Sequence, residues 1–348
     1  TGAGAGSGQQ SGPNGDGAAQ GGGSAGASGG GPLVPAVGPP PGVPCAGTAS
    51  PATLRQFDIY MMIDTNISIP LSGAWDNVAH GLTAYVEDRC SAGVSVAVRY
   101  FGIDCNPSTY TTPTTPMGIL PDNASSIEHQ IPTMPFMVSP TLPALQGALT
   151  YASSRANAYP DSKQIVVLIS DGFYDFTCQA PDLVQSVFSA VKPPSSGATA
   201  KTYVLALDAP NLIQVPGLSQ LLSPASRFGP LDTIAQNGGT GTARHIDLQA
   251  ATSVFAQALV DIQHDAQPCD YAVPDAVHAN PTAMDLGATD ATGQMSALPR
   301  VANAAACGVG YYLDAPSSPS RATLCPGTCT QIKSRCDKVV WVMGCKMP

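Results

Sequence analysis

The sequence predicts a doubly wound α/β domain with a mostly parallel sheet, preceded by a disordered tether and followed by a small β-rich, disulfide-held appendage. Three observations predict this fold. Apolar runs alternate with helical patterns over residues 54–268, which is typical of a parallel sheet covered on both faces. Residues 1–44 hold 16 of the 36 glycines and one charged residue. Six of the ten cysteines fall within residues 269–348.

Residues 1–44 are expected to be a flexible tether that becomes stiffer toward the segment 32–44, which is rich in proline. The tether contains no aromatic residue, so it cannot bury enough apolar surface to offset the entropy of ordering it. Two glycine motifs within it are typical of nucleophile elbows and dinucleotide-binding loops. Neither motif follows a strand or opens a helix, so neither predicts a function.

The elements of the central domain follow from apolar patterns. Residues 57–63 form an apolar run that ends at Asp64, which is typical of a strand buried on both faces. Residues 164–169 form the clearest buried strand. The other expected elements are a helix over 75–89, a strand over 94–101, a long surface connection over 104–137, a helix over 144–152, a helix over 183–191, a strand over 202–207, a short helix over 231–236, a short strand over 244–246 and a closing helix over 251–264.

The last 80 residues show a different pattern. Helical periodicity fades after Cys269, and the short apolar runs 310–313 and 339–342 resemble strands. Together with the cysteines, these runs predict a β-rich appendage over residues 269–348 that depends on disulfides for its stability.

Ten cysteines in a chain with only 11% charged residues indicate disulfides and an oxidising compartment, so we expect an exported protein. Cys90 and Cys105 flank one strand and are predicted to form a local pair. The other pairings are left open. Cys325, Cys329, Cys336 and Cys345 resemble a zinc knuckle in their spacing, but disulfides are the favoured interpretation in an exported chain.

Charge and composition exclude several classes of function. With 15 Lys+Arg against 24 Asp+Glu and a net charge of −9, the chain is a poor binder of phosphate backbones, so no nucleic-acid partner is expected. No apolar run approaches the ~20 residues of a transmembrane helix. The five histidines are scattered and form no metal-binding or catalytic pattern.

Polar residues follow two predicted strands and precede one predicted helix. Asp64, Asn66 and Ser68 come after the first strand, Ser139 lies before the helix over 144–152, and Asp171 comes after the strand over 164–169. Ligands of doubly wound sheets bind at the carboxyl ends of the strands. Carboxylate, amide and hydroxyl oxygens suit Mg²⁺, Mn²⁺ or Ca²⁺ rather than zinc. By contrast, Asp58 and Asp76 are expected to be surface or capping residues.

This arrangement resembles the metal-ion-dependent adhesion site of von Willebrand factor type A domains. That family carries Asp-x-Ser-x-Ser after its first strand, a later Thr before a helix, and Asp-Gly after its central strand. Asp64 and Ser68 match the first motif, Asp171 matches the last, and Ser139 stands in the threonine position, with Thr141 as the alternative. The resemblance covers residues 54–268, and the tail is similar to an extension of many exported bacterial proteins, often lipoproteins.

The resemblance implies a site that binds a partner and does not catalyse a reaction. Asn66, Ser68 and Ser139 would hold the cation, and Asp64 and Asp171 would act mainly through water. An open position on the cation would accept a carboxylate from a protein partner. Asn66 and Ser139 depart from the family pattern, so a degenerate site that holds no metal is the alternative.

We therefore expect an exported adhesion or protein-binding module, extracellular or associated with the outer membrane or cell surface. A lipid anchor upstream of Thr1 is compatible with this expectation. The first alternative is a structural envelope or assembly protein with a degenerate metal site. A hydrolase is the least favoured alternative, because no nucleophile–base pair is evident.

Overall fold

The computed structural model describes residues 49–65, 75–102, 104–133, 139–172, 178, 200–208, 224–247, 252–275 and 284–343. The predicted tether, the helix expected over 183–191, and Asn66, Ser68, Cys45 and Cys345 lie outside the described residues. Among the described residues, no helix combines the length and apolar character needed to cross a membrane.

A six-stranded sheet forms the centre of the α/β domain, with the strand order β4-β3-β2-β5-β6-β7. Five strands run parallel and β4 pairs with β3 in the antiparallel direction, which confirms the doubly wound, mostly parallel fold. The strands are β2 (Phe57–Asp64), β3 (Ser95–Phe101), β4 (Thr115–Ile119), β5 (Lys163–Ser170), β6 (Lys201–Asp208) and β7 (Arg244–Asp247).

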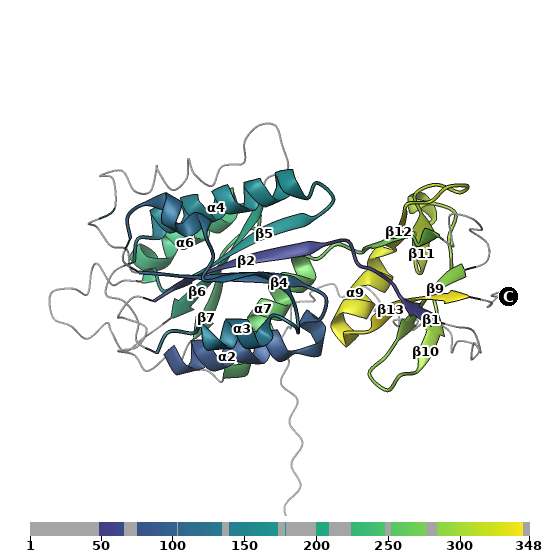
Figure 1. Ribbon diagram of the computed structural model, residues 1–348, viewed down its shortest axis with the longest axis horizontal. Coiled ribbons are helices and arrows are strands. Elements are labelled where there is room, and N and C mark those ends of the chain that lie inside the picture. Colours follow the sequence, from purple (N-terminus) through teal and green to yellow (C-terminus); the bar gives the residue numbers. More distant parts are fainter. Residues whose placement is uncertain are drawn as a thin grey trace, which may run out of the picture. The chain divides into compact units, whose positions relative to one another are not determined.

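Helices cover both faces of this sheet (Figure 1). Alternate side chains of β2 point to opposite faces, so Ile59 and Met61 pack with α2 (Trp75–Glu87), α3 (Ala124–His129) and α7 (Thr252–Ala266). Tyr60 and Met62 pack with α4 (Thr141–Ala158) and α6 (Pro224–Asn237) on the other face. Both faces of β2 and β5 are therefore buried, as their apolar runs predict.

The chain reverses its winding direction between β2 and β5. From β2 it passes to β3 on one side, and it later returns to place β5 on the other side of β2. Ligands of doubly wound sheets bind at such a switch point, outside the carboxyl ends of the strands. Asp64 ends β2 and Ser170 ends β5, so both lie at this point.

The prediction of a plain surface connection over 104–137 was wrong. This segment contains η2 (Pro107–Thr111), the edge strand β4 and α3, and it buries Tyr110, Leu120 and Ile127 in the two cores of the domain. Pro116 in β4 is tolerated because an edge strand needs only one side of its backbone for pairing. The buried residues stand too far apart in the sequence to form a periodic pattern.

The appendage has two small sheets around a core of its own. Leu286, Tyr311 and Trp341 are fully buried in this core. One sheet has the order β1-β13-β9-β10 and the other β11-β12-β8. The elements are β1 (Ala49–Pro51), β8 (Asp270–Ala272), β9 (Met284–Thr289), β10 (Met295–Ala297), β11 (Tyr311–Leu313), β12 (Arg321–Leu324), α9 (Pro326–Arg335) and β13 (Lys338–Met343).

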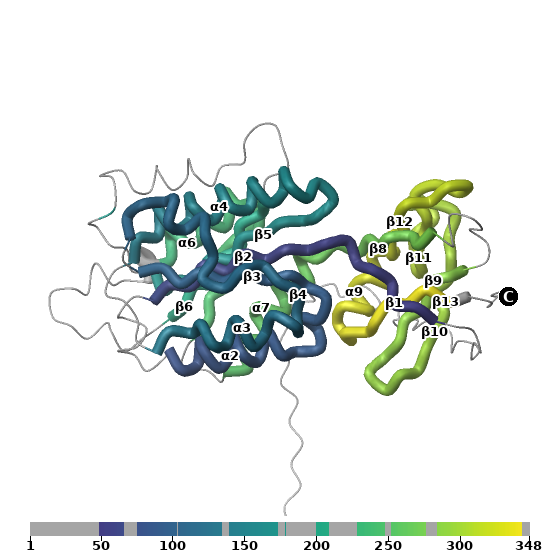
Figure 2. Tube along the Cα trace, viewed as in Figure 1, coloured from purple at the N-terminus to yellow at the C-terminus, as the bar shows by residue number. Residues whose placement is uncertain are grey.

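Two parts of the appendage were not predicted. The strand β1 precedes the α/β domain in the sequence, yet it pairs with β13 (Figure 2). The helix α9 begins with Pro326 in its first turn, where proline's missing N–H is no disadvantage. Its apolar pattern is weak, because the residues on its buried side include Thr328, Cys329 and Ile332.

Four disulfides join described cysteines: Cys90–Cys336, Cys105–Cys178, Cys269–Cys329 and Cys307–Cys325. The predicted Cys90–Cys105 pair was therefore wrong. These two cysteines stand before and after β3, and an extended strand separates its ends by about 3.3 Å per residue, far beyond disulfide reach. A zinc knuckle is also excluded for Cys325, Cys329 and Cys336, because each pairs with a different, distant cysteine.

Candidate metal centre

Two carboxylates mark the edge of the sheet at the switch point. Asp64 is the last residue of β2, and Asp171 directly follows the last residue of β5. Both side chains are fully buried. A carboxylate in this position needs hydrogen-bond donors or a cation, because burial without them strongly disfavours its charged form.

One oxygen of Asp64 connects three segments of the chain. Its Oδ2 accepts a hydrogen bond from the Ser139 hydroxyl at 2.6 Å and another from the Ser170 hydroxyl at 2.7 Å. Ser139 immediately precedes the first turn of α4, whereas Ser170 ends β5. The geometry thus brings the loop before α4 to the ends of the two central strands.

Further hydrogen bonds, most of them to the backbone, hold the residues around Asp64 in place. The Thr141 amide donates to the Ser139 carbonyl at 2.8 Å, and the two side-chain hydroxyls lie 3.1 Å apart. The Gly172 amide donates to the Ser170 hydroxyl oxygen at 3.2 Å. Thr65 donates from both its amide and its hydroxyl to the Phe101 carbonyl, which ties the end of β2 to β3.

The described donor set fits a hard divalent cation. It consists of carboxylate and hydroxyl oxygens, which are the ligands that Mg²⁺, Mn²⁺ and Ca²⁺ prefer. A serine hydroxyl that donates its proton to a carboxylate keeps its lone pairs for a cation. Ser139 and Ser170 both donate to Asp64, and each keeps one lone pair beside its contact with Thr141 Oγ1 or the Gly172 amide.

Three of the five predicted site residues lie at this edge, and two cannot be placed. Asp64 and Ser139 are in direct contact, and Asp171 is adjacent in the chain to Ser170. Asn66 and Ser68 lie outside the described residues, so the full ligand set remains a prediction. Thr141, the alternative to Ser139, is buried beside it.

Ser170 is not among the ligands that the sequence predicts. The sequence places it in the segment Ser170-Asp171-Gly172, directly after the strand over 164–169, and in the structure its hydroxyl donates to Asp64 and so joins β2 to β5. The available signal was its position directly before Asp171, as the single hydroxyl residue that closes an otherwise apolar run.

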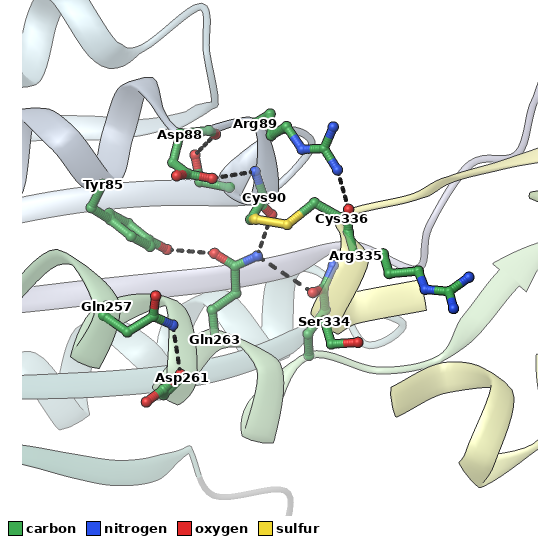
Figure 3. Close-up of a disulfide and its surroundings, with 12 residues drawn as sticks. Tyr85, Asp88, Arg89, Cys90, Gln257, Asp261, Gln263, Ser334, Arg335 and Cys336 are labelled. Atoms are coloured by element: carbon green, nitrogen blue, oxygen red, sulfur yellow. Dashed lines mark hydrogen bonds between the residues drawn. A yellow bond between two sulfur atoms is a disulfide. The ribbon is translucent and has the colours of Figure 1, made fainter. Parts of the chain in front are cut away.

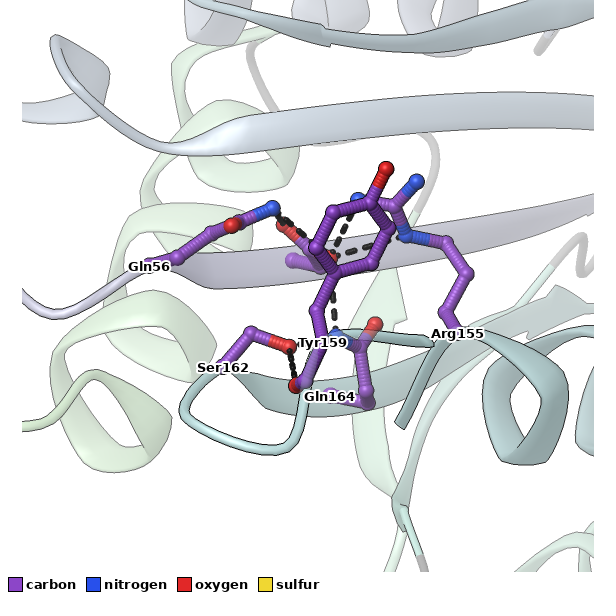
Figure 4. A network of polar contacts seen from close by, with 6 residues as sticks. Gln56, Arg155, Tyr159, Ser162 and Gln164 are labelled. Atoms are coloured by element: carbon purple, nitrogen blue, oxygen red, sulfur yellow. Dashed lines mark hydrogen bonds and ion pairs between the residues drawn. The ribbon is translucent and has the colours of Figure 1, made fainter. Parts of the chain in front are cut away.

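The expectation that Asp58 is a surface or capping residue was wrong. Asp58, near the start of β2, is 0% exposed, and its Oδ2 accepts hydrogen bonds from Arg155 Nε at 2.9 Å, Arg155 Nη2 at 2.8 Å and Gln164 Nε2 at 2.8 Å (Figure 4). Gln56 donates to its other oxygen at 3.0 Å. This network fixes the start of β2 to α4 and β5, so Asp58 has a structural role.

The described histidines make contacts elsewhere. His245 lies 3.3 Å from Asp232, and His129 contacts the Ser125 carbonyl at 2.6 Å. Among the described residues, no histidine hydrogen-bonds to Ser139 or Ser170. Among the described residues, the serines at the sheet edge therefore bond to a carboxylate and not to a histidine.

Comparisons with known proteins concern the fold. No family model matches the sequence, and no curated protein matches it. Among solved structures, the chain is similar to the pilus adhesin SpaC from Lactobacillus rhamnosus GG, with 11% identity, a TM-score of 0.44 and coverage of 83% of this chain and 38% of that chain. It is also similar to a von Willebrand factor type A protein from Catenulispora acidiphila, with 11% identity, a TM-score of 0.40 and coverage of 83% and 57%.

A third similar structure is proximal thread matrix protein 1 from the mussel byssus, solved with a zinc-occupied MIDAS motif, with 14% identity, a TM-score of 0.38 and coverage of 64% of this chain and 50% of that chain. The chain thus spans about two fifths of the length of the adhesin and about half that of the byssus protein. The structures similar to this chain are von Willebrand factor type A proteins. Likenesses this distant say nothing about the partner or metal of this chain.

Proposed function

We propose that this protein is a binding module that engages a carboxylate of a protein partner through a divalent cation at the switch point of its sheet. The observation that carries the proposal is the double hydrogen bond to Asp64 Oδ2, which aligns the hydroxyls of Ser139 and Ser170 at the end of β2. Asp64, Asn66, Ser68, Ser139 and Asp171 are the proposed ligands, directly or through water.

The residues of this chain perform the positioning. Asp64 orients both serine hydroxyls with their lone pairs available, and the backbone bonds of Thr65 and Thr141 hold the loops that carry them. When bound, the cation would supply a Lewis-acidic position for an oxygen of the partner. Since hydroxyl ligands neutralise less of its charge than carboxylates, the cation would retain its attraction for an acidic group.

The disulfides fit an extracellular or envelope location. Four of them lie in the described residues, and such density is typical of oxidising compartments. We propose that the protein acts on the cell surface or in the envelope, held there by a lipid anchor upstream of Thr1, and that it is not an enzyme. The contacts of Ser139 and Ser170 with Asp64 support this proposal, because they differ from those of a nucleophile with its base.

The metal part of the proposal predicts a cation-dependent stability. Mg²⁺ or Mn²⁺ at about 100 times its Kd should raise Tm by roughly 5 °C, and EDTA should reverse the rise, because a ligand of the native state stabilises that state. The measurement is thermal unfolding of the full chain, monitored by circular dichroism. Asp171→Ala and Ser139→Ala should abolish the rise while the spectrum remains native.

Ser154→Ala is the matched control, because this exposed serine on α4 bonds only to the carbonyl one turn before it in the described structure. Its Tm rise should equal that of the parent chain. A rise that survives Asp171→Ala would place the cation elsewhere. The carboxylate part is tested with an immobilised glutamate peptide and its glutamine counterpart: retention on the first alone, in Mg²⁺ and not in EDTA, is expected.

A structural protein with a degenerate metal site is the second candidate. The observation in its favour is that Asp64 Oδ2 accepts hydrogen bonds from two serine hydroxyls, Ser139 and Ser170. In that case the polar cluster would serve to fix α4 to the ends of β2 and β5. The absence of any Tm change in millimolar Mg²⁺ and Mn²⁺ would favour this candidate.

A further inference from the structure

The Cys90–Cys336 disulfide joins the α/β domain to the appendage. Cys90 lies in η1 (Arg89–Ser91), just after α2, and Cys336 follows the last residue of α9. Both cysteines are partly exposed and line a cavity of about 770 Å³. The partial exposure and the cavity thus give a dissolved reagent a route to the disulfide. Figure 3 shows the disulfide with the residues around it.

Positive charge is concentrated around this disulfide. Each cysteine directly follows an exposed arginine, Arg89 or Arg335, and Arg89 Nη2 donates to the Arg335 carbonyl. Lys333, one turn earlier in α9, donates from Nζ to the carbonyls of His264 and Gln267 at 2.6 Å each. The charged residues that line the cavity are four cations, Arg89, Arg155, Lys333 and Lys338, and one carboxylate, Asp337. Asp88, Asp261 and Asp265 are further carboxylates that act on His264 or Lys333 from outside this lining. Cations therefore outnumber carboxylates in the cavity lining, although the whole chain has 15 Lys+Arg against 24 Asp+Glu.

An imidazole lies next to the two sulfurs. A ring nitrogen of His264 and the sulfur atoms of Cys90 and Cys336 all lie within 4.8 Å of one another. Burial and the charge of Lys333 lower the pKa of His264, so the ring is neutral at pH 7 and able to exchange a proton. In the oxidised protein the sulfurs are bonded to each other, so this cluster is not a metal site.

The two cysteines differ in backbone conformation and packing. Cys336 has a φ of 55°, the left-handed conformation that normally requires glycine at the end of a helix. Holding a cysteine there costs about 1 kcal/mol. Cys90, in contrast, packs against the main apolar core. Both cysteines are partly exposed, and Cys336 is the one with the strained backbone.

We propose that Cys90–Cys336 is a thiol–disulfide exchange site for anionic thiols. A thiolate attacks Cys336 Sγ, the Cys90–Cys336 bond breaks, and Cys90 leaves as a thiolate that takes a proton beside His264. A mixed disulfide with Cys336 forms, and a second thiolate of the reagent then releases Cys336 as a thiol. Each step exchanges one S–S bond for another, and the reagent as a dithiol or two thiols is oxidised in the process.

The surroundings distinguish this disulfide from the other three. Cys325 is 0% exposed and Cys329 is 6% exposed, so neither of their disulfides offers both sulfurs to a reagent. Cys105 is exposed, but its neighbour is Asp104, whose charged form is favoured by hydrogen bonds from Thr109 and Asn106 that lower its pKa. Cys90–Cys336 also has carboxylates beside it, Asp88 and Asp337, but Arg89 and Arg335 precede its two cysteines and offset their charge, whereas no cation adjoins Cys105 in the sequence.

The experiment compares two small thiols of opposite charge on the folded chain. The protein is treated with mercaptoethanesulfonate or with cysteamine at equal thiolate concentration, quenched with acid at intervals and alkylated. Mass spectrometry then gives the rate for each cysteine. With the sulfonate, we expect Cys90 and Cys336 to react at least about threefold faster than Cys105 and Cys178. With cysteamine, this preference should fall.

Two variants and one control test whether the arginines and His264 are responsible for the exchange rates of Cys90–Cys336. Arg89→Gln combined with Arg335→Gln should slow exchange with the sulfonate but not with cysteamine, and Lys201→Gln, an exposed cation outside the cavity lining, should change neither rate. His264→Asn should alter the pH profile of exchange. Circular dichroism confirms that each variant is folded. Faster reaction of Cys105–Cys178 with both thiols, or an unchanged rate in the double variant, would overturn the proposal.

Discussion

Asp58 and Asp64 stand on the same strand and have different partners. Asp58 accepts hydrogen bonds from the guanidinium of Arg155 and from two glutamine amides, whereas Asp64 accepts hydrogen bonds from two serine hydroxyls. The first carboxylate is part of a closed ion-pair network. The second accepts hydrogen bonds from hydroxyl oxygens, a type of group that can bind a hard divalent cation.

The ion pair of Asp58 predicts a large effect of removing its partner. Arg155→Ala should lower the free energy of unfolding by about 3 kcal/mol, because it leaves a buried carboxylate without its cation. Arg321→Ala is the control: it removes an ion pair with Asp161, whose side chain is 88% exposed, and should cost less than about 1 kcal/mol. Urea denaturation measures both, and equal losses would contradict the structural role of Asp58.

At the scale of single residues, the sequence predicts where a functional side chain stands in the fold better than it predicts which side chains it contacts. Asp64 and Asp171 were identified because each stands at the carboxyl end of a strand, where the fold class predicts a ligand site, whereas Ser139 was chosen in the loop before α4 by its resemblance to a family motif. Asp58 was misjudged because its burial depends on Arg155, and nothing local links a residue of the first strand to one late in α4. Ser170 was not chosen although its position directly before Asp171 was visible in the sequence; only its contact with Asp64 depends on the fold.

At the scale of elements, the position of α4 depends on its close contact with η2 at a glycine. A Cβ added to Gly147 would lie 2.4 Å from the Pro107 carbonyl oxygen and 2.5 Å from Tyr110 Cβ, so α4 packs against η2 at this glycine. The segment 104–137 therefore contributes to the core through single residues in contact with a helix. That is why no apolar periodicity revealed it, although the strands with continuous apolar runs were predicted within about a residue of their observed bounds.

The close contact between α4 and η2 predicts that alanine substitutions at two helical glycines change the stability in opposite directions. Gly147→Ala should destabilise the protein by about 2 kcal/mol, because α4 and η2 must separate. Gly229→Ala, in α6, meets nothing within 4 Å and should stabilise it by up to about 1 kcal/mol through helix propensity. Thermal unfolding of the two variants checks the signs, and a stabilised Gly147→Ala variant would contradict the observed packing.

At the scale of the whole molecule, Lys333 joins α9 of the appendage to the end of α7. Burial, followed by the charge of Lys163, lowers the pKa of Lys333 from 10.5 to about 8. Below pH 8 both the folded and the unfolded state carry the proton, so the cost of burying the charge is fully present. Between pH 8 and pH 10.5 the folded state loses the Lys333 proton while the unfolded state still carries it. The contribution of Lys333 to the free energy of unfolding therefore rises with pH in this range.

Lys333→Met should remove that rise. The Tm of the parent chain, relative to that of the variant, is expected to increase from pH 7 to 9.5, a range below the titration of the buried tyrosines. Differential scanning calorimetry in buffers of matched ionic strength gives the two curves. Parallel curves would show that the amine is protonated over the whole range in the folded protein.

The overall organisation was predictable to a different degree in each part. Strand and helix patterns predicted the α/β domain, and cysteine content predicted an appendage held by disulfides. The pairing of the cysteines was not predictable, because it depends on which ends of the strands meet, as Cys90 and Cys105 show. The helix α9 was hidden because its buried side carries Thr328 and a cysteine in place of a full apolar stripe.

The pairing of β1 with β13 has a consequence for synthesis on the ribosome. Ala49–Pro51 emerges before the entire α/β domain, but its partner Lys338–Met343 emerges after it. The α/β domain can close as soon as α7 has been translated, while β1 must stay unpaired throughout that time. The appendage therefore completes its sheet last, and premature termination between α7 and β13 would leave a complete α/β domain preceded by an unpaired β1.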